Sequence, residues 1–131
     1  MVTLDTSALV ALLAKRDAHH QRMRSLLLAE KPPYLVPEPV LAELAYLVET
    51  RVGPHVMALF LADVEAGAWK LTPVSPHAGR IRQLVLRYAD LPLGTVDAAV
   101  VAVAEANGGR LLSLDGHFRV LAGEGKIEVI G

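Results

Sequence analysis

The chain has 131 residues, of which 53% are apolar and 21% charged, and this composition predicts a single globular domain rather than a disordered segment. It contains no cysteine, which excludes disulfides, zinc thiolates and a thiol nucleophile. Lys and Arg number 13 against 14 Asp and Glu, so the net charge of -1 leaves nucleic-acid binding to local basic patches. No signal peptide or spanning stretch of about 18 apolar residues is visible, so we expect a cytoplasmic protein without a membrane partner.

The first expected element is a short buried strand, residues 2–4, which ends on Asp5 and turns directly into a helix. Thr6 and Ser7 are expected to supply N-cap oxygens for that helix, which continues over residues 8–15. Asp5 then lies at the carboxyl end of a strand and beside a helix N-terminus. In an open α/β sheet, this is where ligands bind.

Strands and helices alternate along the rest of the chain, and prolines and glycines mark most boundaries. The expected helices cover residues 18–29, 37–52, 54–67, 75–88 and 96–106, with a helical turn at 118–121. The expected strands cover residues 34–36, 69–74, 110–114 and 127–130, and residues 90–94 form a loop. This alternation predicts an α/β domain over residues 1–131 in which helices cover both faces of a parallel sheet.

Four acids occupy unusual positions in this pattern. Asp5 and Asp115 each end an apolar strand, Asp97 lies in the first turn of the most apolar helix, and Glu43 borders an apolar helical stripe. Each has an ordinary explanation: a strand-end turn or cap for the first two, the helix dipole for Asp97, and a solvated flank for Glu43. Taken together they favour a site, because strand-end acids of a parallel sheet meet at one edge and a helix N-terminus can face that edge.

A cluster of four carboxylates predicts a divalent cation, since without one the acids would repel each other and some would have to be protonated. Mg²⁺ and Mn²⁺ are hard ions that prefer oxygen ligands. Such a site polarises a phosphate, lowers the pKa of a bound water and stabilises a leaving oxygen. With no thiol and no Ser/His/Asp arrangement in the chain, the acids favour phosphodiester hydrolysis over acyl transfer.

Four segments carry a resemblance to a known family: residues 4–8 (LDTSA), 41–44 (LAEL), 91–98 (LPLGTVDA) and 112–118 (LSLDGHF). In order and spacing they resemble the PIN-domain nucleases, and specifically the small VapC-like toxins of prokaryotic toxin–antitoxin pairs. The resemblance covers nearly the whole chain. It implies a three-layer α/β/α domain whose parallel five-stranded sheet has the first strand at its centre, and Mg²⁺- or Mn²⁺-dependent cleavage of RNA.

The resemblance also implies the roles of the four acids as catalytic residues and metal ligands. Asp5 and Asp97 are expected to hold a catalytic metal, Glu43 to act as a ligand or water-orienting base, and Asp115 to hold a second metal or tune the first. Hydroxyl groups that support these acids are expected from Thr6, Ser7 and Ser113, the last of which is threonine in many members of the family.

The remaining expectations concern binding partners. A small antitoxin protein and a homodimer follow from the resemblance. Val56, Leu59 and Phe60 are candidates for exposed apolar surface that contacts a partner, and ordinary core packing is the alternative for each of them. The alternative is a catalytically silent PIN-like module that binds RNA or a protein. The candidates for contact with RNA are Arg16, Arg22, Arg80, Arg82 and His117, and a solvated surface is the more ordinary explanation for each.

Overall fold

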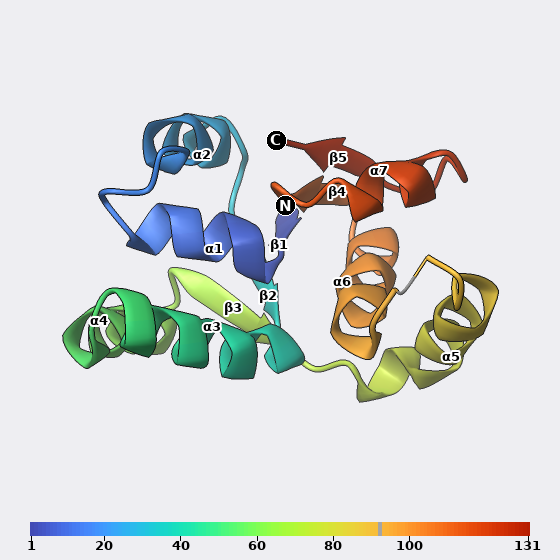
Figure 1. The fold of residues 1–131 in the computed structure, drawn as a ribbon, viewed down its shortest axis with the longest axis horizontal. Coiled ribbons are helices and arrows are strands. Elements are labelled where there is room, and N and C mark those ends of the chain that lie inside the picture. The colour runs from blue at the N-terminus through green and yellow to red at the C-terminus, as the bar shows by residue number, and fades with distance from the viewer. Residues whose placement is uncertain (92) are drawn as a thin grey trace.

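Strand β1 (Val2–Leu4) is the centre of a five-stranded sheet in the computed structural model, which describes residues 1–91 and 93–131 (Figure 1). The strands follow the order β3-β2-β1-β4-β5, and all four pairings between neighbours are parallel. The predicted parallel sheet with the first strand at its centre is confirmed. The other strands are β2 (Tyr34–Pro37), β3 (Trp69–Thr72), β4 (Arg110–Leu112) and β5 (Glu128–Ile130).

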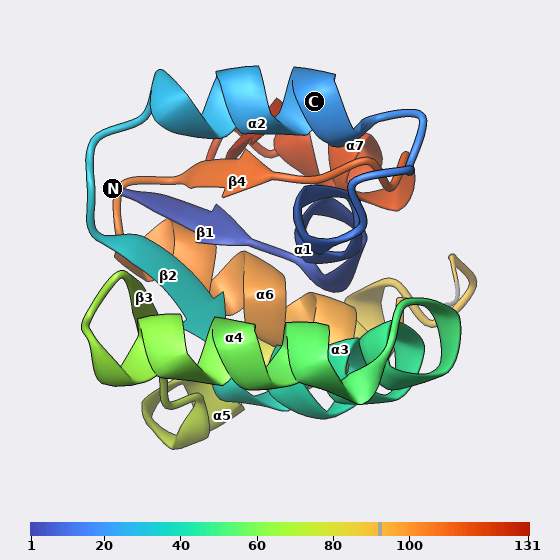
Figure 2. The ribbon, with the colours of Figure 1, turned by 90° about the vertical axis from the view of Figure 1, so that its left-hand side faces the viewer.

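Helices cover both faces of this sheet, and Figure 2 shows α2 on one side of β1 and β4 and α6 on the other. This confirms the predicted three-layer α/β fold. Among the described residues, no helix combines the length and the apolar character that crossing a membrane requires. The helices are α1 (Thr6–Leu13), α2 (His20–Leu28), α3 (Glu38–Arg51), α4 (Pro54–Glu65), α5 (Ala78–Arg87), α6 (Thr95–Ala106) and α7 (His117–Ala122).

Helix α6 is the most deeply buried helix of the described chain, with every residue from 98 to 104 buried. It is apolar on all sides because it packs between the sheet and the helices α3 and α5. Its first turn carries Asp97, which is half-buried. A helix buried in this way cannot rotate or slide without disturbing the core, so Asp97 stands on a rigid support.

Several predicted boundaries are wrong for identifiable reasons. Helix α1 begins at Thr6, and its N-cap is the side chain of Asp5 rather than that of Thr6 or Ser7. The segment expected as one helix from residue 75 contains a 3₁₀ turn (Ser75–His77) before α5 begins. Strand β4 ends at Leu112, and two residues later the Leu114 N–H donates to the Ser7 hydroxyl instead of a neighbouring strand. The loop expected over residues 90–94 includes Pro92, which lies outside the described residues.

The apolar residues expected to bind a partner differ in exposure. Leu59 is 65% exposed on α4, whereas Phe60 is only 1% exposed and packs in the core. Phe60 also contacts the Trp69 ring, with the ring centroids 5.6 Å apart. Phe60 therefore follows the core-packing alternative, because its helix turns this side chain toward the sheet.

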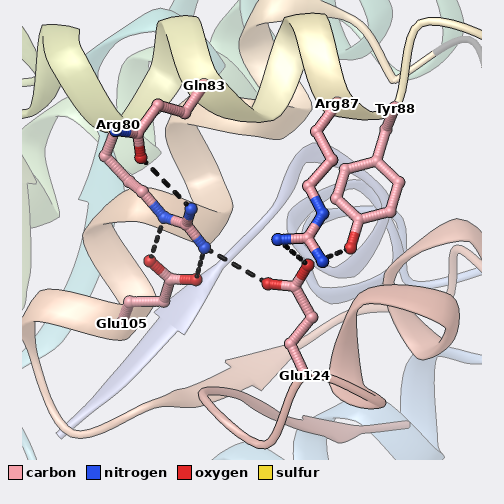
Figure 3. Close-up of polar contacts among 6 residues, drawn as sticks. All are labelled: Arg80, Gln83, Arg87, Tyr88, Glu105 and Glu124. Atoms are coloured by element: carbon pink, nitrogen blue, oxygen red, sulfur yellow. Dashed lines mark hydrogen bonds and ion pairs between the residues drawn. The ribbon is translucent and has the colours of Figure 1, made fainter.

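An ion-pair network joins α5 to α6 and to the segment after α7 (Figure 3). Arg80 forms a bidentate pair with Glu105 on α6, with both nitrogen–oxygen distances at 2.8 Å, and reaches Glu124 at 3.3 Å. Arg87 and the Tyr88 hydroxyl also bind Glu124. These contacts hold the pKa of Glu124 below its ordinary value, with the Tyr88 hydrogen bond as the largest cause, and the pKa of Arg80 above its ordinary value, mainly through Glu105.

Candidate active site

The carboxyl ends of β1 and β4 open into a cleft of about 640 Å³. All four acids singled out in the sequence line this cleft, although they come from four separate segments. Asp5 follows β1, Glu43 lies on α3, Asp97 lies in the first turn of α6, and Asp115 follows β4. The parallel order of the sheet explains the convergence, because β1 and β4 are neighbours and end at the same edge.

Asp5 is the most buried of the four acids, with 4% of its surface exposed. Its Oδ2 accepts a hydrogen bond from the Ser113 hydroxyl at 2.6 Å, and its Oδ1 accepts from the Ser7 hydroxyl at 2.8 Å and the Ala8 N–H at 2.9 Å. Burial raises the pKa of Asp5, and the hydrogen bonds from Ser113, Ala8 and Ser7 oppose that rise without cancelling it. Asp5 therefore stands in a fixed position with its carboxylate poorly solvated.

The hydroxyl groups of Ser7 and Ser113 also fix the loop that carries Asp115. The Ser7 oxygen accepts the Leu114 N–H at 3.0 Å, and the Ser113 oxygen accepts the Asp115 N–H at 2.9 Å. Each hydroxyl thus donates to Asp5 and accepts from the loop after β4. This arrangement ties two acids that are far apart in the sequence to one small polar network.

Thr6 performs a similar task for the acid on α3. Its hydroxyl donates to Oε1 of Glu43 at 2.6 Å, joining the start of α1 to α3. Glu43 itself is exposed, so its carboxylate stays in contact with water. Each of the three hydroxyl residues expected to support the site therefore contacts one of the four acids.

Asp97, Asp115 and His117 form the tightest group of candidate metal ligands in the described part of the chain. One ligand atom from each lies within 4.8 Å of the other two, and Asp5 and Glu43 are not part of this group. The Nδ1 atom of His117 lies 3.4 Å from Oδ1 of Asp115, which also accepts the His117 backbone N–H at 2.9 Å. His117 is thereby held beside the acids.

The acids influence each other strongly enough to perturb Asp97. Burial, followed by the negative charges of Asp115, Asp5 and Glu43, raises the pKa of Asp97 to about 6, while His117 opposes the rise. All four carboxylates therefore belong to one electrostatic unit. Several oxygen donors whose charges repel one another in a half-buried cleft are the donor set that suits a hard divalent cation.

The predicted RNA-contact arginines lie elsewhere. Within residues 1–91 and 93–131, none of the four lines the cleft. Arg16 is exposed after α1, and Arg22 donates to the backbone carbonyl of Gly131. Arg80 is held by Glu105, and Arg82 borders a separate apolar groove along α5.

Three polar residues that the sequence interpretation did not select do line the cleft: Asp17, Tyr46 and Arg51. The signal for one of them was present, because Glu43, Leu47 and Arg51 are spaced four residues apart and share one face of α3. The grouping of arginines along the sequence pointed instead to α2 and α5. Position on a helix face is the better guide here than proximity in the sequence.

Comparison with known families finds a match for most of the chain, in which the PIN domain model covers residues 2–124. The chain belongs to the PIN-domain family, as the four sequence segments suggested. Ribonuclease VapC26 of Mycobacterium tuberculosis is 35% identical to it over 134 residues, which cover 97% of this chain and 98% of that protein.

Two solved structures show that the fold is shared more widely. The toxin VapC20 of Mycobacterium tuberculosis, described as cleaving the sarcin–ricin loop, aligns with a TM-score of 0.82 and 23% identity over 92% of this chain and 95% of its own. A toxin–antitoxin complex from Klebsiella pneumoniae aligns with a TM-score of 0.74 and 18% identity over 100% of this chain and 97% of its own. At these identities the likeness establishes the architecture alone.

Proposed function

We propose that the chain is a metal-dependent endoribonuclease that hydrolyses RNA phosphodiester bonds and acts as the toxin of a toxin–antitoxin pair. The observation that carries this proposal is the convergence of Asp5, Glu43, Asp97 and Asp115 on one cleft, where burial and the charges of the other three acids raise the pKa of Asp97 to about 6. The similarity to ribonuclease VapC26 over nearly the full length of both chains supports the same activity.

The residues proposed to hold Mg²⁺ or Mn²⁺ are Asp5, Glu43, Asp97 and Asp115. Asp97 and Asp115 contribute ligand atoms that are already close together, and Asp5 is held in place by its hydrogen bonds. When bound, the cation supplies positive charge that polarises the scissile phosphate and acidifies a water molecule. Its charge also removes the repulsion that the carboxylates experience without it.

The side chains around the acids then have distinct tasks in this proposal. Ser7 and Ser113 hold Asp5 and the loop of Asp115 in a fixed relation. Thr6 orients Glu43, which is exposed and is therefore able to accept a proton from the attacking water. His117 lies beside Asp115, outside the residues that line the cleft, and remains the candidate for contact with the RNA at this point.

The proposal also includes a binding partner for this chain. The Klebsiella pneumoniae neighbour is a toxin–antitoxin complex, which supports a small antitoxin protein as the partner of this chain. The exposed Leu59 on α4 remains a candidate contact for it. The homodimer and the cytoplasmic location remain predictions from the sequence, and size-exclusion chromatography of the purified chain tests the first of them.

Cleavage of labelled RNA by the purified, partner-free chain tests the activity. The substrates are the sarcin–ricin loop, chosen because the VapC20 neighbour is named for it, and a structured RNA of mixed sequence. Each is incubated with Mn²⁺, Mg²⁺ or EDTA, using the native chain, Asp97→Asn, and Asp63→Asn as a control on the exposed face of α4.

We expect cleavage that needs the metal, disappears in Asp97→Asn and persists in Asp63→Asn. The melting temperature measured in the same samples separates this from the silent-module alternative. A nuclease with this site gains melting temperature from Mn²⁺, and Asp97→Asn reduces the gain. A chain that neither cleaves nor gains melting temperature from the metal is a binding module, and the proposal is then wrong.

A further inference from the structure

The wall of the cleft formed by α3 continues beyond the four acids. Tyr46, Leu47 and Arg51 line the same cleft as Glu43 and lie toward the C-terminal end of that helix. Glu43, Leu47 and Arg51 follow one another at intervals of one helical turn. At 1.5 Å of rise per residue, Arg51 lies about 12 Å along the helix from Glu43.

Arg51 is a cation at the far end of an otherwise acidic cleft. It is exposed, and the ion pairs formed among the described residues do not include it. Arg80 and Arg110, by contrast, are each bound to two acids. The guanidinium of Arg51 is therefore available for an anion, and its planar set of donors suits a phosphate.

Tyr46 precedes Arg51 by five residues on the same helix, lines the same cleft and is 70% exposed. An exposed aromatic ring on a cleft wall has a face on which a planar group can stack. Leu47, half-buried between Tyr46 and Arg51 in the lining, adds an apolar contact at the same place. A nucleotide presents both complementary groups, because its base stacks on an aromatic ring and its phosphate binds an arginine.

We propose that Tyr46, Leu47 and Arg51 form a nucleotide-binding subsite, here called the α3 subsite, for the RNA strand that runs from the acids along α3. Arg51 binds a backbone phosphate, and Tyr46 stacks on a base next to it. The distance of about 12 Å between Glu43 and Arg51 corresponds to about three or four nucleotides of a stacked strand with about 3.4 Å of rise. Arg51 therefore binds the RNA a few nucleotides from the bond to be cut, and this inference rests on the proposed function.

Binding measurements test the α3 subsite independently of cleavage. Labelled oligoadenylate and oligouridylate of about 12 nucleotides are titrated with the protein in Ca²⁺ and followed by fluorescence anisotropy over a series of salt concentrations. The variants are Arg51→Gln, Tyr46→Ala and Tyr46→Phe. The matched control is Arg24→Gln, which removes an exposed arginine on α2 outside the cleft lining.

Arg51→Gln is expected to weaken both oligonucleotides several-fold and to reduce the slope of log affinity against log salt by about 0.7, the value for one phosphate contact on a single strand. Tyr46→Ala is expected to weaken oligoadenylate by about tenfold and oligouridylate less, because a purine offers the larger stacking face. Tyr46→Phe keeps the ring and is expected to retain the affinity. Arg24→Gln is expected to bind as the native chain does.

The two proposals fail in different ways. One result is that no metal-dependent cleavage is found but Arg51→Gln still lowers the affinity for the oligonucleotides and the slope of log affinity against log salt. The proposed hydrolysis is then wrong, and the α3 subsite is supported. If the native chain cleaves RNA and both Arg51→Gln and Tyr46→Ala bind like Arg24→Gln, the α3 subsite is wrong and this wall is left for a protein partner. Failure of the native chain to bind either oligonucleotide also overturns it.

Discussion

The Ser113 hydroxyl donates to Oδ2 of Asp5 at 2.6 Å while its oxygen accepts the Asp115 N–H at 2.9 Å. One small side chain thus links an acid that ends β1 to an acid that follows β4. The link is buried, since Ser113 is 1% exposed and Asp5 4%. A buried carboxylate needs such donors, because each one lost leaves charge without compensation.

Ser113→Ala is expected to lower the free energy of unfolding by about 1–3 kcal/mol, the cost of removing a partner from a buried charged group. The change also frees the Asp115 N–H, so metal-dependent cleavage should fall with it. Urea unfolding and the cleavage assay measure the two effects. Ser113→Thr keeps the hydroxyl and serves as the control, and a Ser113→Ala variant as stable and active as the native chain would contradict this role.

Asp97→Asn is expected to separate activity from stability. It removes a proposed metal ligand, so cleavage should be lost. It also removes a charge that burial and three neighbouring carboxylates disfavour, so the metal-free protein should become more resistant to urea at pH 7. Asp63→Asn, on the exposed surface of α4, should change neither property. A metal-free Asp97→Asn variant less stable than the native chain would show that its carboxylate is satisfied locally.

The stability of the metal-free protein is expected to fall as pH rises from about 4 to about 6. In this window Asp97 in the unfolded chain has already lost its proton, whereas in the folded chain, with a pKa of about 6, it still holds it. The raised pKa of Asp5 acts in the same direction. Urea unfolding in EDTA at several pH values measures the slope, and Asp97→Asn should flatten it.

Mn²⁺ is expected to reverse this dependence, because protons and the metal compete for the same carboxylates. The rise in melting temperature on adding Mn²⁺ should be small at pH 5 and should grow as the pH passes about 6. Thermal unfolding with and without the metal measures the difference at each pH. A gain that is the same at all pH values would place the metal away from Asp97.

Arg80→Gln is expected to lower the free energy of unfolding by about 1–3 kcal/mol, since it leaves the partly buried carboxylate of Glu105 without its partner and removes one of the three partners of Glu124 (Figure 3). Its affinity for RNA should not change, because Arg80 lies outside the cleft lining. Arg87→Gln is the matched comparison. The Arg87 side chain is 64% exposed, so its loss should cost less than about 1 kcal/mol. Equal losses in both variants would contradict the role given to Glu105.

The fold was predictable because local residue pairs mark the boundaries of its helices and strands. Pairs such as Gly53-Pro54 and Gly108-Gly109 interrupt the apolar runs, and the alternation of the runs specifies a parallel sheet. The strand-end acids Asp5 and Asp115 were predictable for the same reason. The N-cap of α1 was not predicted, because Asp5 was assigned a role in metal binding alone. A carboxylate has enough lone pairs to cap a helix and to face a cleft at the same time.

The arginines show where interpretation of the sequence stops. Arg80 resembles a surface cation until Glu105, 25 residues later, is found opposite it. Arg51 belongs to neither group of arginines in the sequence. Only the packing of α3 against α1 and α6 makes it a lining residue of the same cleft as the acids. Such pairings depend on how helices are placed relative to one another, which hydrophobic periodicity does not specify.

The pairing of β1 with β4, in which Leu4 lies opposite Leu112, has a consequence for the chain during its synthesis. A ribosome releases Asp5 and Glu43 well before Asp97 and Asp115, and contacts between such distant segments form late in folding. The unfinished chain holds only Asp5 and Glu43 until α6 has been made, and it lacks Asp115 until β4 is complete, so it has no completed cleft. In the proposed nuclease, the nascent chain therefore gains its complete set of acids only after nearly all of its residues have emerged.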